Sequence, residues 1–264
     1  MIKTLFTIFV LFSSLSLADT RMNGTVTMNG RITGNPTPAV AAPFSPTDIA
    51  GLEVWLKADG DVYNTGTTQA TDGQTVATWV DASGNGNNAT SIAAPTFETN
   101  VINGKPAIRW NGDKMEVANF SGVQPTTIFL VVSRTTDGAA MTYIDGLDQF
   151  TQLVYCTSPS GTLAMYAGSG IGGTGPDTGD WGVISANFNG GSSTAFLNGT
   201  SAIGAGNTGA GNAGGLTLGE SGGGSFGYDG DIAEVLYYDS TLSEANRELV
   251  EDYLGEKYGI TITN

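Results

Sequence analysis

The sequence predicts an all-β protein, built as an antiparallel jelly-roll sandwich of two sheets with one α-helix at the C-terminal end. Of the 264 residues, 39 are glycine and 40% are hydrophobic. This apolar share allows a packed core and excludes a fully disordered chain. Glycine at this level is typical of many tight turns between short strands. No helical pattern alternates with the strand-like runs, so a parallel βαβ architecture is not expected.

The strand-like runs begin with three short segments that each contain a tryptophan, at residues 54–58, 76–80 and 107–111. Residues 126–133 form the most β-branched run and are expected to be a central strand. Further strands are predicted at residues 142–144, 150–155, 163–167, 181–188, 194–197, 216–218 and 232–238. Gly, Asn, Asp and Pro lie between the runs, which favours a sandwich or jelly roll.

One helix is predicted near the C-terminal end. Ser243 can cap it, and Glu244 lies in the first turn, where negative charge suits the helix dipole. Gly259 is placed to end it. An apolar stripe at helical spacing is formed by Leu249, Val250, Tyr253, Leu254 and Tyr258. We therefore expect this helix to pack on the sandwich as a seal.

The first residues read as an export signal. Lys3 precedes an apolar run, and Ser16-Leu-Ala18 places small residues before an expected cleavage site near Ala18. We therefore predict a signal peptide at residues 1–18, a linker or strand segment at 19–47, and the sandwich domain at 48–264. The mature protein is expected to be secreted, extracellular or periplasmic. An unpaired strand at residues 22–33 could add to the edge of another subunit's sheet, which would allow self-association or subunit association.

Composition excludes several chemistries. The chain has no histidine and one cysteine, so it cannot build a Cys₄ or Cys₂His₂ zinc site or a Ser-His-Asp triad. Its formal charge is −15, which excludes the basic face that nucleic acid or an anionic membrane requires. No second long apolar stretch follows the export signal, so no membrane insertion is expected. Cys156 reads as a small buried residue, the alternative being an exposed thiol that pairs between chains.

Several segments resemble a known family. Residues 76–89 contain Trp-Val-Asp-Ala-Ser-Gly-Asn-Gly-Asn, the most specific match, and residues 51–59, 102–112, 228–239 and 250–259 add further blocks in order. These blocks resemble bacterial laminin-G-like domains of the concanavalin A-like lectin and glucanase superfamily. The resemblance implies one two-sheet jelly roll. It says much less about the ligand, because the same sandwich hosts lectins, adhesins and hydrolases.

Two sets of candidate site residues stand out. Oxygen-bearing side chains alternate at Asp81, Ser83, Asn85 and Asn87, as in the first half of an EF-hand loop, which makes them candidate Ca²⁺ ligands. The alternative is an Asx-rich turn whose side chains bond to the backbone. The candidate ligand-binding residues lie beside glycine-rich loops and are Trp181, Tyr228, Asp229 and Asp231. Long loops such as the glycine-rich stretch 204–227 are often functional, which hints at a binding rim.

Catalysis is not expected. Glycoside hydrolysis needs two carboxylates across the scissile bond. The resemblance would place them in a Glu-x-Asp-x-x-Glu strand, and this chain has no such motif. Asp231 and Glu234 are three positions apart, which on a regular strand places them on opposite faces. The sequence therefore predicts a secreted, non-catalytic binding or adhesion module for glycan or a cell-surface polymer, with Ca²⁺ as an optional cofactor. The alternatives are a structural subunit of an extracellular assembly and a polysaccharide hydrolase or lyase.

Overall fold

A computed structural model describes residues 43–118, 120–137, 139–158 and 161–264. The predicted signal peptide at residues 1–18 and the predicted docking strand at 22–33 lie outside these residues. All described residues except Pro43 belong to one compact unit, Phe44–Asn264. No helix among the described residues is long and apolar enough to cross a membrane.

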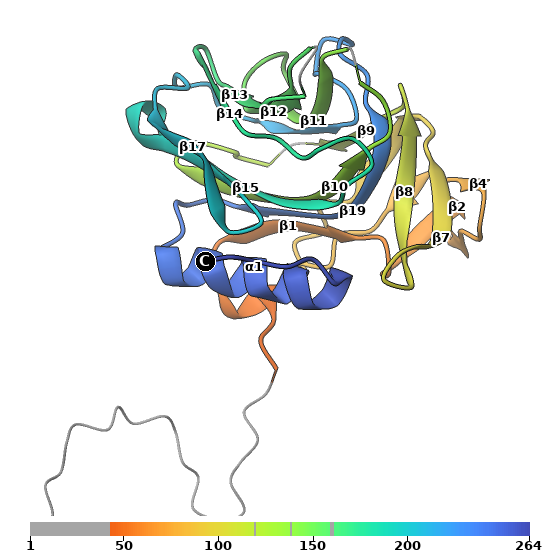
Figure 1. Cartoon of the computed structure of the whole chain (residues 1–264). Helices are drawn as coiled ribbons and strands as arrows, with labels where there is room; N and C mark the ends of the chain where they lie inside the picture. The colour runs from red at the N-terminus through yellow and green to blue at the C-terminus, as the bar shows by residue number, and fades with distance from the viewer. Residues whose placement is uncertain (1–42, 119, 138, 159–160) are drawn as a thin grey trace, which may run out of the picture. The chain divides into compact units, whose positions relative to one another are not determined.

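The unit is a sandwich of two antiparallel sheets, which confirms the predicted fold class (Figure 1). The first sheet, called here the helix-covered sheet, runs in the order β17 (Thr200–Gly206), β16 (Ser193–Leu197), β15 (Gly182–Phe188), β10 (Thr126–Arg134), β19 (Asp229–Tyr238), β8 (Lys105–Asn111), β7 (Thr96–Ile102) and β4 (Gln74–Thr75), with β1 (Leu52–Lys57) also pairing with β19. The second sheet runs in the order β14 (Gly170–Gly173), β13 (Leu163–Tyr166), β12 (Leu153–Cys156), β11 (Met141–Gly146), β18 (Gly215–Leu218), β9 (Lys114–Ala118), β6 (Ala89–Ala93), β5 (Thr78–Trp79), β2 (Val62–Thr65) and β3 (Thr68–Gln69). Short 3₁₀ turns lie at Pro46–Asp48 and Gly190–Ser192.

The core lies between the two sheets. The predicted central strand is β10, which pairs with β15 on one side and β19 on the other and is buried along its whole length. The predicted strand at 150–155 begins later, at Leu153, because Phe150 lies in a loop with a φ of 63°. Several strands escaped prediction, because most of them are very short or carry exposed or half-buried polar or small residues; they are β2, β3, β4, β6, β7, β9, β14 and β17. Cys156 is fully buried in this core.

The C-terminal helix α1 (Glu244–Tyr258) covers the outer face of the helix-covered sheet (Figure 1). The Ser243 hydroxyl accepts a hydrogen bond from the Asn246 N–H, and Gly259 ends the helix with a φ of 69°. Val250 and Leu254 pack in a second apolar cluster with residues of β10 and β19. The molecule thus has three layers, and the helix leaves the outer face of the second sheet uncovered.

Candidate functional site

An aromatic cavity opens on the outer face of the second sheet. Its volume is about 260 Å³, and its lining residues are Phe150, Leu153, Tyr155, Tyr166 and Phe226. We call it the aromatic cavity. Sequence analysis did not single out these residues as a site.

The floor of the aromatic cavity follows from strand alternation. Leu153 and Tyr155 are two apart on β12, so both point away from the core, whereas Val154 between them is buried in the core cluster. Leu153 is the register partner of Tyr166 on β13, and Tyr166 therefore points to the same side. Neither tyrosine hydroxyl has a hydrogen-bond partner within the described part of the chain, so both are free to bond to a ligand.

The walls come from two loops that we call the rim loops, residues 147–152 and 219–228. Phe150 lies in the first and Phe226 in the second, and their ring centroids are 6.0 Å apart. The Phe150 ring also meets the Tyr166 ring edge-on at 6.0 Å. Both phenylalanines have positive φ, 63° and 59°, a conformation that bulky side chains rarely adopt. Such strain is common at ligand sites, and here it aims two rings at one place.

Asp145, near the end of β11, ties the two rim loops together. Its buried carboxylate accepts hydrogen bonds from backbone N–H groups in both loops. The donors are Gly146, Phe150, Thr151, Gln152 and Gly222, at 2.7–3.3 Å. Burial raises the pKa of this carboxyl, while the N–H groups around it act in the opposite direction. One side chain therefore fixes the loops that carry both phenylalanines.

The rim loops also pack closely on each other. A Cβ on Gly222 would lie 2.6 Å from the Leu147 carbonyl oxygen, and one on Gly223 would lie 2.3 Å from the side chain of Gln149. At Gly222 the neighbours are backbone atoms, so only glycine permits this approach, whereas the Gln149 side chain beside Gly223 could move aside. Gly222 therefore lets the second rim loop approach the first, and a binding rim in the stretch 204–227 stays a prediction.

The predicted ligand-binding residues beside Tyr228 are engaged within the protein. Tyr228 is 0% exposed, and its hydroxyl donates a hydrogen bond to the Ser133 carbonyl at 2.7 Å. Asp229 accepts from the Thr135 hydroxyl at 2.9 Å. Asp231 makes a two-point ion pair with the Arg109 guanidinium, at 2.9 and 3.0 Å. None of these three lines the aromatic cavity.

Trp181, the fourth predicted residue, lines a different cavity. This cavity has a volume of about 360 Å³ and contains Asp177, Asp180 and Asn198 beside the indole. The indole packs against the apolar cluster under helix α1. The structure therefore brings Trp181 to a polar surface hollow but not into contact with the aromatic cavity.

The four predicted metal ligands lie in one tight turn between β5 and β6. The two Asp81 carboxylate oxygens accept hydrogen bonds from the N–H groups of Trp55, Ser83 and Asn87 and from the Ser83 hydroxyl. The side chains of Ser83, Asn85 and Asn87 all donate to the Glu53 carbonyl. Donors converge on this point, and the Asp81 carboxylate is fully hydrogen-bonded within the protein. Ca²⁺ binding at this turn stays a prediction. The geometry is that of an Asx-rich turn.

Asp231 and Glu234 do not form a catalytic pair. A β-bulge in β19 puts Ala233 out of register with β10, so Asp231 and Glu234 both lie on the side of helix α1. The expectation of opposite faces was wrong, because it assumed a regular strand. Each carboxylate is nevertheless bound to its own cation, Asp231 to Arg109 and Glu234 to Lys257.

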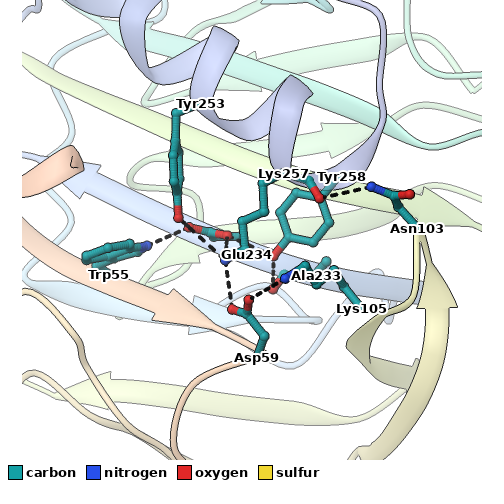
Figure 2. Close-up of polar contacts among 9 residues, drawn as sticks. All are labelled: Trp55, Asp59, Asn103, Lys105, Ala233, Glu234, Tyr253, Lys257 and Tyr258. Carbon is teal, nitrogen blue, oxygen red and sulfur yellow. Dashed lines mark hydrogen bonds and ion pairs between the residues drawn. The ribbon is translucent and has the colours of Figure 1, made fainter. Parts of the chain in front are cut away.

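Figure 2 shows Glu234 at the centre of a network under helix α1. Its buried carboxylate accepts from the Trp55 indole N–H at 2.6 Å, the Lys257 ammonium at 2.7 Å and the Tyr258 hydroxyl at 2.7 Å. Tyr253 donates a fourth bond at 3.2 Å. With every oxygen bonded and no exposure, Glu234 holds the helix on the sheet and has no open space for a substrate.

Comparisons with known proteins show the same fold. No protein-family model matches the chain, and no curated protein sequence matches it. Domain 4 of AbnA, a GH43 extracellular arabinanase from Geobacillus stearothermophilus, solved in complex with arabinotriose, matches with a TM-score of 0.54 and 15% identity over 75% of this chain and 97% of that domain. Trypanosoma rangeli sialidase matches with a TM-score of 0.56 and 12% identity, over 92% of this chain but 37% of the sialidase. The binding domain of Paraclostridial Mosquitocidal Protein 1 matches with a TM-score of 0.55 and 15% identity, over 80% of this chain and 53% of that one. At these identities the likeness shows a β-sandwich domain.

Proposed function

We propose that this protein is an exported, non-catalytic module of laminin-G-like type that binds a glycan through the aromatic cavity. The observation that carries the proposal is the grouping of four aromatic rings around one open hollow, between the second sheet and the rim loops. Aromatic rings stack on the apolar faces of sugar rings, and tyrosine hydroxyls can bond to sugar hydroxyls. The hollow supplies both kinds of group in one place.

The neighbouring structures support a binding role. One is an arabinanase domain in complex with arabinotriose, and another is the binding domain of a mosquitocidal protein. The pairing of Asp231 with Arg109 and of Glu234 with Lys257 supports a non-catalytic role, because neither acid is free for proton transfer. Export rests on the sequence pattern of residues 1–18.

Retention on polysaccharides tests the proposal. The full mature chain is run through native gels that contain single polysaccharides, with and without EDTA, and retarded migration reports binding. Tyr155→Ala is expected to weaken binding about tenfold, since a stacked ring contributes on the order of 1 kcal/mol beyond its buried area. Tyr155→Phe keeps the ring, so it separates the stacking from the hydroxyl.

Tyr63→Ala is the matched control. Tyr63 lies on β2 of the same sheet, is half-buried and does not line the aromatic cavity. It is expected to bind as the wild type does. Equal weakening by Tyr63→Ala and Tyr155→Ala, or no retention on any polymer, would remove the aromatic cavity as the site.

A further inference from the structure

We infer that the ligand of the aromatic cavity is a neutral carbohydrate, not an anionic one. The inference rests on the proposed function and names the ligand class of the same site. It follows from the uncharged cavity lining, from the negative charge of the rim loops and from the existing contacts of the lysine and arginine side chains.

The lining of the aromatic cavity carries no charge. Four aromatic residues and Leu153 form it, and its polar groups are the hydroxyls of Tyr155 and Tyr166. A sulfate or carboxylate buried here would lose its hydration without gaining a cation, which is unfavourable. A neutral sugar places apolar C–H faces on the rings and hydroxyls on the phenols, so it has no such cost.

The rim loops oppose an anion. They contain Asp148 and Glu220 but no lysine or arginine. Asp148 is exposed, and Glu220 is half-buried. With a formal charge of −15 on the whole chain, the local and the long-range fields have the same sign.

The cations of the described chain are already committed. Lys57 lies 4.4 Å from the centre of the Trp55 ring. Every other lysine and arginine in residues 43–264 is paired with a carboxylate, namely Lys105, Arg109, Lys114, Arg134, Arg247 and Lys257. Pairs of this kind would have to break before an anionic polymer could use these charges.

Lys114 is the cation that approaches the rim loops. Its ammonium donates to the Gly222 carbonyl at 3.3 Å and pairs with Glu116 at 2.9 Å. Only 13% of its side chain is exposed. It therefore holds the rim loop 219–228 through a backbone carbonyl and is not presented to a ligand.

Affinity electrophoresis with two panels tests the inference. The neutral panel is arabinan, xylan and β-glucan, and the anionic panel is polygalacturonate, alginate and heparin. We expect retardation by at least one neutral polymer, changing less than about twofold between about 50 mM and 500 mM NaCl, because salt screens charge pairs and not stacking. Tyr155→Ala is expected to weaken this binding about tenfold.

Asp148→Lys sharpens the test, because this exposed rim residue does not line the cavity. The affinity of Asp148→Lys for the neutral polymer is expected to stay within about twofold of the wild-type value, because an uncharged ligand does not respond to the charge of the rim loops. Retention on anionic polymers alone, weakened both by salt and by Tyr155→Ala, would overturn the inference but keep the proposed site. Retention on neither panel would overturn the proposed function and the inference with it.

Discussion

Asp145 offers the sharpest test of how the binding surface is built. Its Oδ1 accepts from the N–H groups of Gly146, Thr151 and Gln152, whereas its Oδ2 accepts from Phe150 and Gly222. Asp145→Asn keeps the shape but replaces one oxygen with an N–H₂ group. In the orientation that keeps the three bonds of Oδ1, this donor faces the N–H groups of Phe150 and Gly222. Among the described residues, the bond from Gly222 is the one bond that Asp145 makes to the second rim loop, whereas Thr151 and Gln152 still hold the first.

The magnitude follows from these contacts. A hydrogen bond to a charged group contributes about 1.5–3 kcal/mol, so losing two removes roughly 3–6 kcal/mol. Because burial raises the pKa of Asp145, removing its charge returns part of this loss. We expect a net loss of about 2 kcal/mol, which for a domain of this size lowers the melting temperature by about 4–8 °C.

Two measurements check the prediction: thermal unfolding, and affinity for whichever polysaccharide the wild type binds. We expect Asp145→Asn to remain folded at 25 °C, to melt earlier and to bind at least about tenfold more weakly, since loose rim loops must be ordered at each binding event. Asp148→Asn is the matched control, because it changes the same group on the exposed part of the same loop. It is expected to match the wild type in both measurements.

The result that would refute this reasoning is an Asp145→Asn protein with wild-type affinity. A lower melting temperature with unchanged binding would show that the carboxylate stabilises the fold without positioning Phe150 and Phe226. An unchanged melting temperature would show that the backbone N–H groups find other acceptors.

Three further expectations concern stability. Glu234→Ala removes the buried acceptor beneath helix α1 and is expected to cost about 3–5 kcal/mol in urea unfolding, with Glu234→Gln losing less. Asp81→Ala leaves several N–H groups without their acceptor and is expected to cost about 2 kcal/mol of stability. Calcium or EDTA is expected to leave the melting temperature of the wild type unchanged. A rise in melting temperature with calcium would contradict the hydrogen-bonded turn. The pKa of Asp145 is raised in the folded protein, so its contribution to the free energy of unfolding is full below the ordinary pKa of 3.8 and is lost as pH rises through the folded pKa. The difference in the free energy of unfolding between wild type and Asp145→Asn should therefore narrow from pH 4 to pH 7. A difference that widens would show that the pKa is lowered on folding.

The sequence predicted elements where local pattern and burial agree. The β-branched run at 126–133 became β10, because a strand buried on both faces favours an unbroken apolar run, here residues 128–132. The helix was predictable from its ends, since Ser243 and Gly259 act through contacts a few residues away. These signals are local and need no knowledge of the fold.

The aromatic cavity could not be predicted in the same way. Phe150 and Phe226 lie 76 positions apart in the sequence, and they meet because Asp145 binds both loops. The available signal was indirect, in the glycines around Phe226, which allow close packing. The bulge at Ala233 was equally hidden, because it depends on the register with β10.

The burial of Cys156 makes this protein convenient to label. It is the one cysteine in the sequence, and its sulfur is enclosed in the core. Asp148→Cys would therefore place a single reachable thiol on the rim for a maleimide fluorophore, without first removing a native one. Such a conjugate would report directly, by a change in emission, when a sugar enters the hollow.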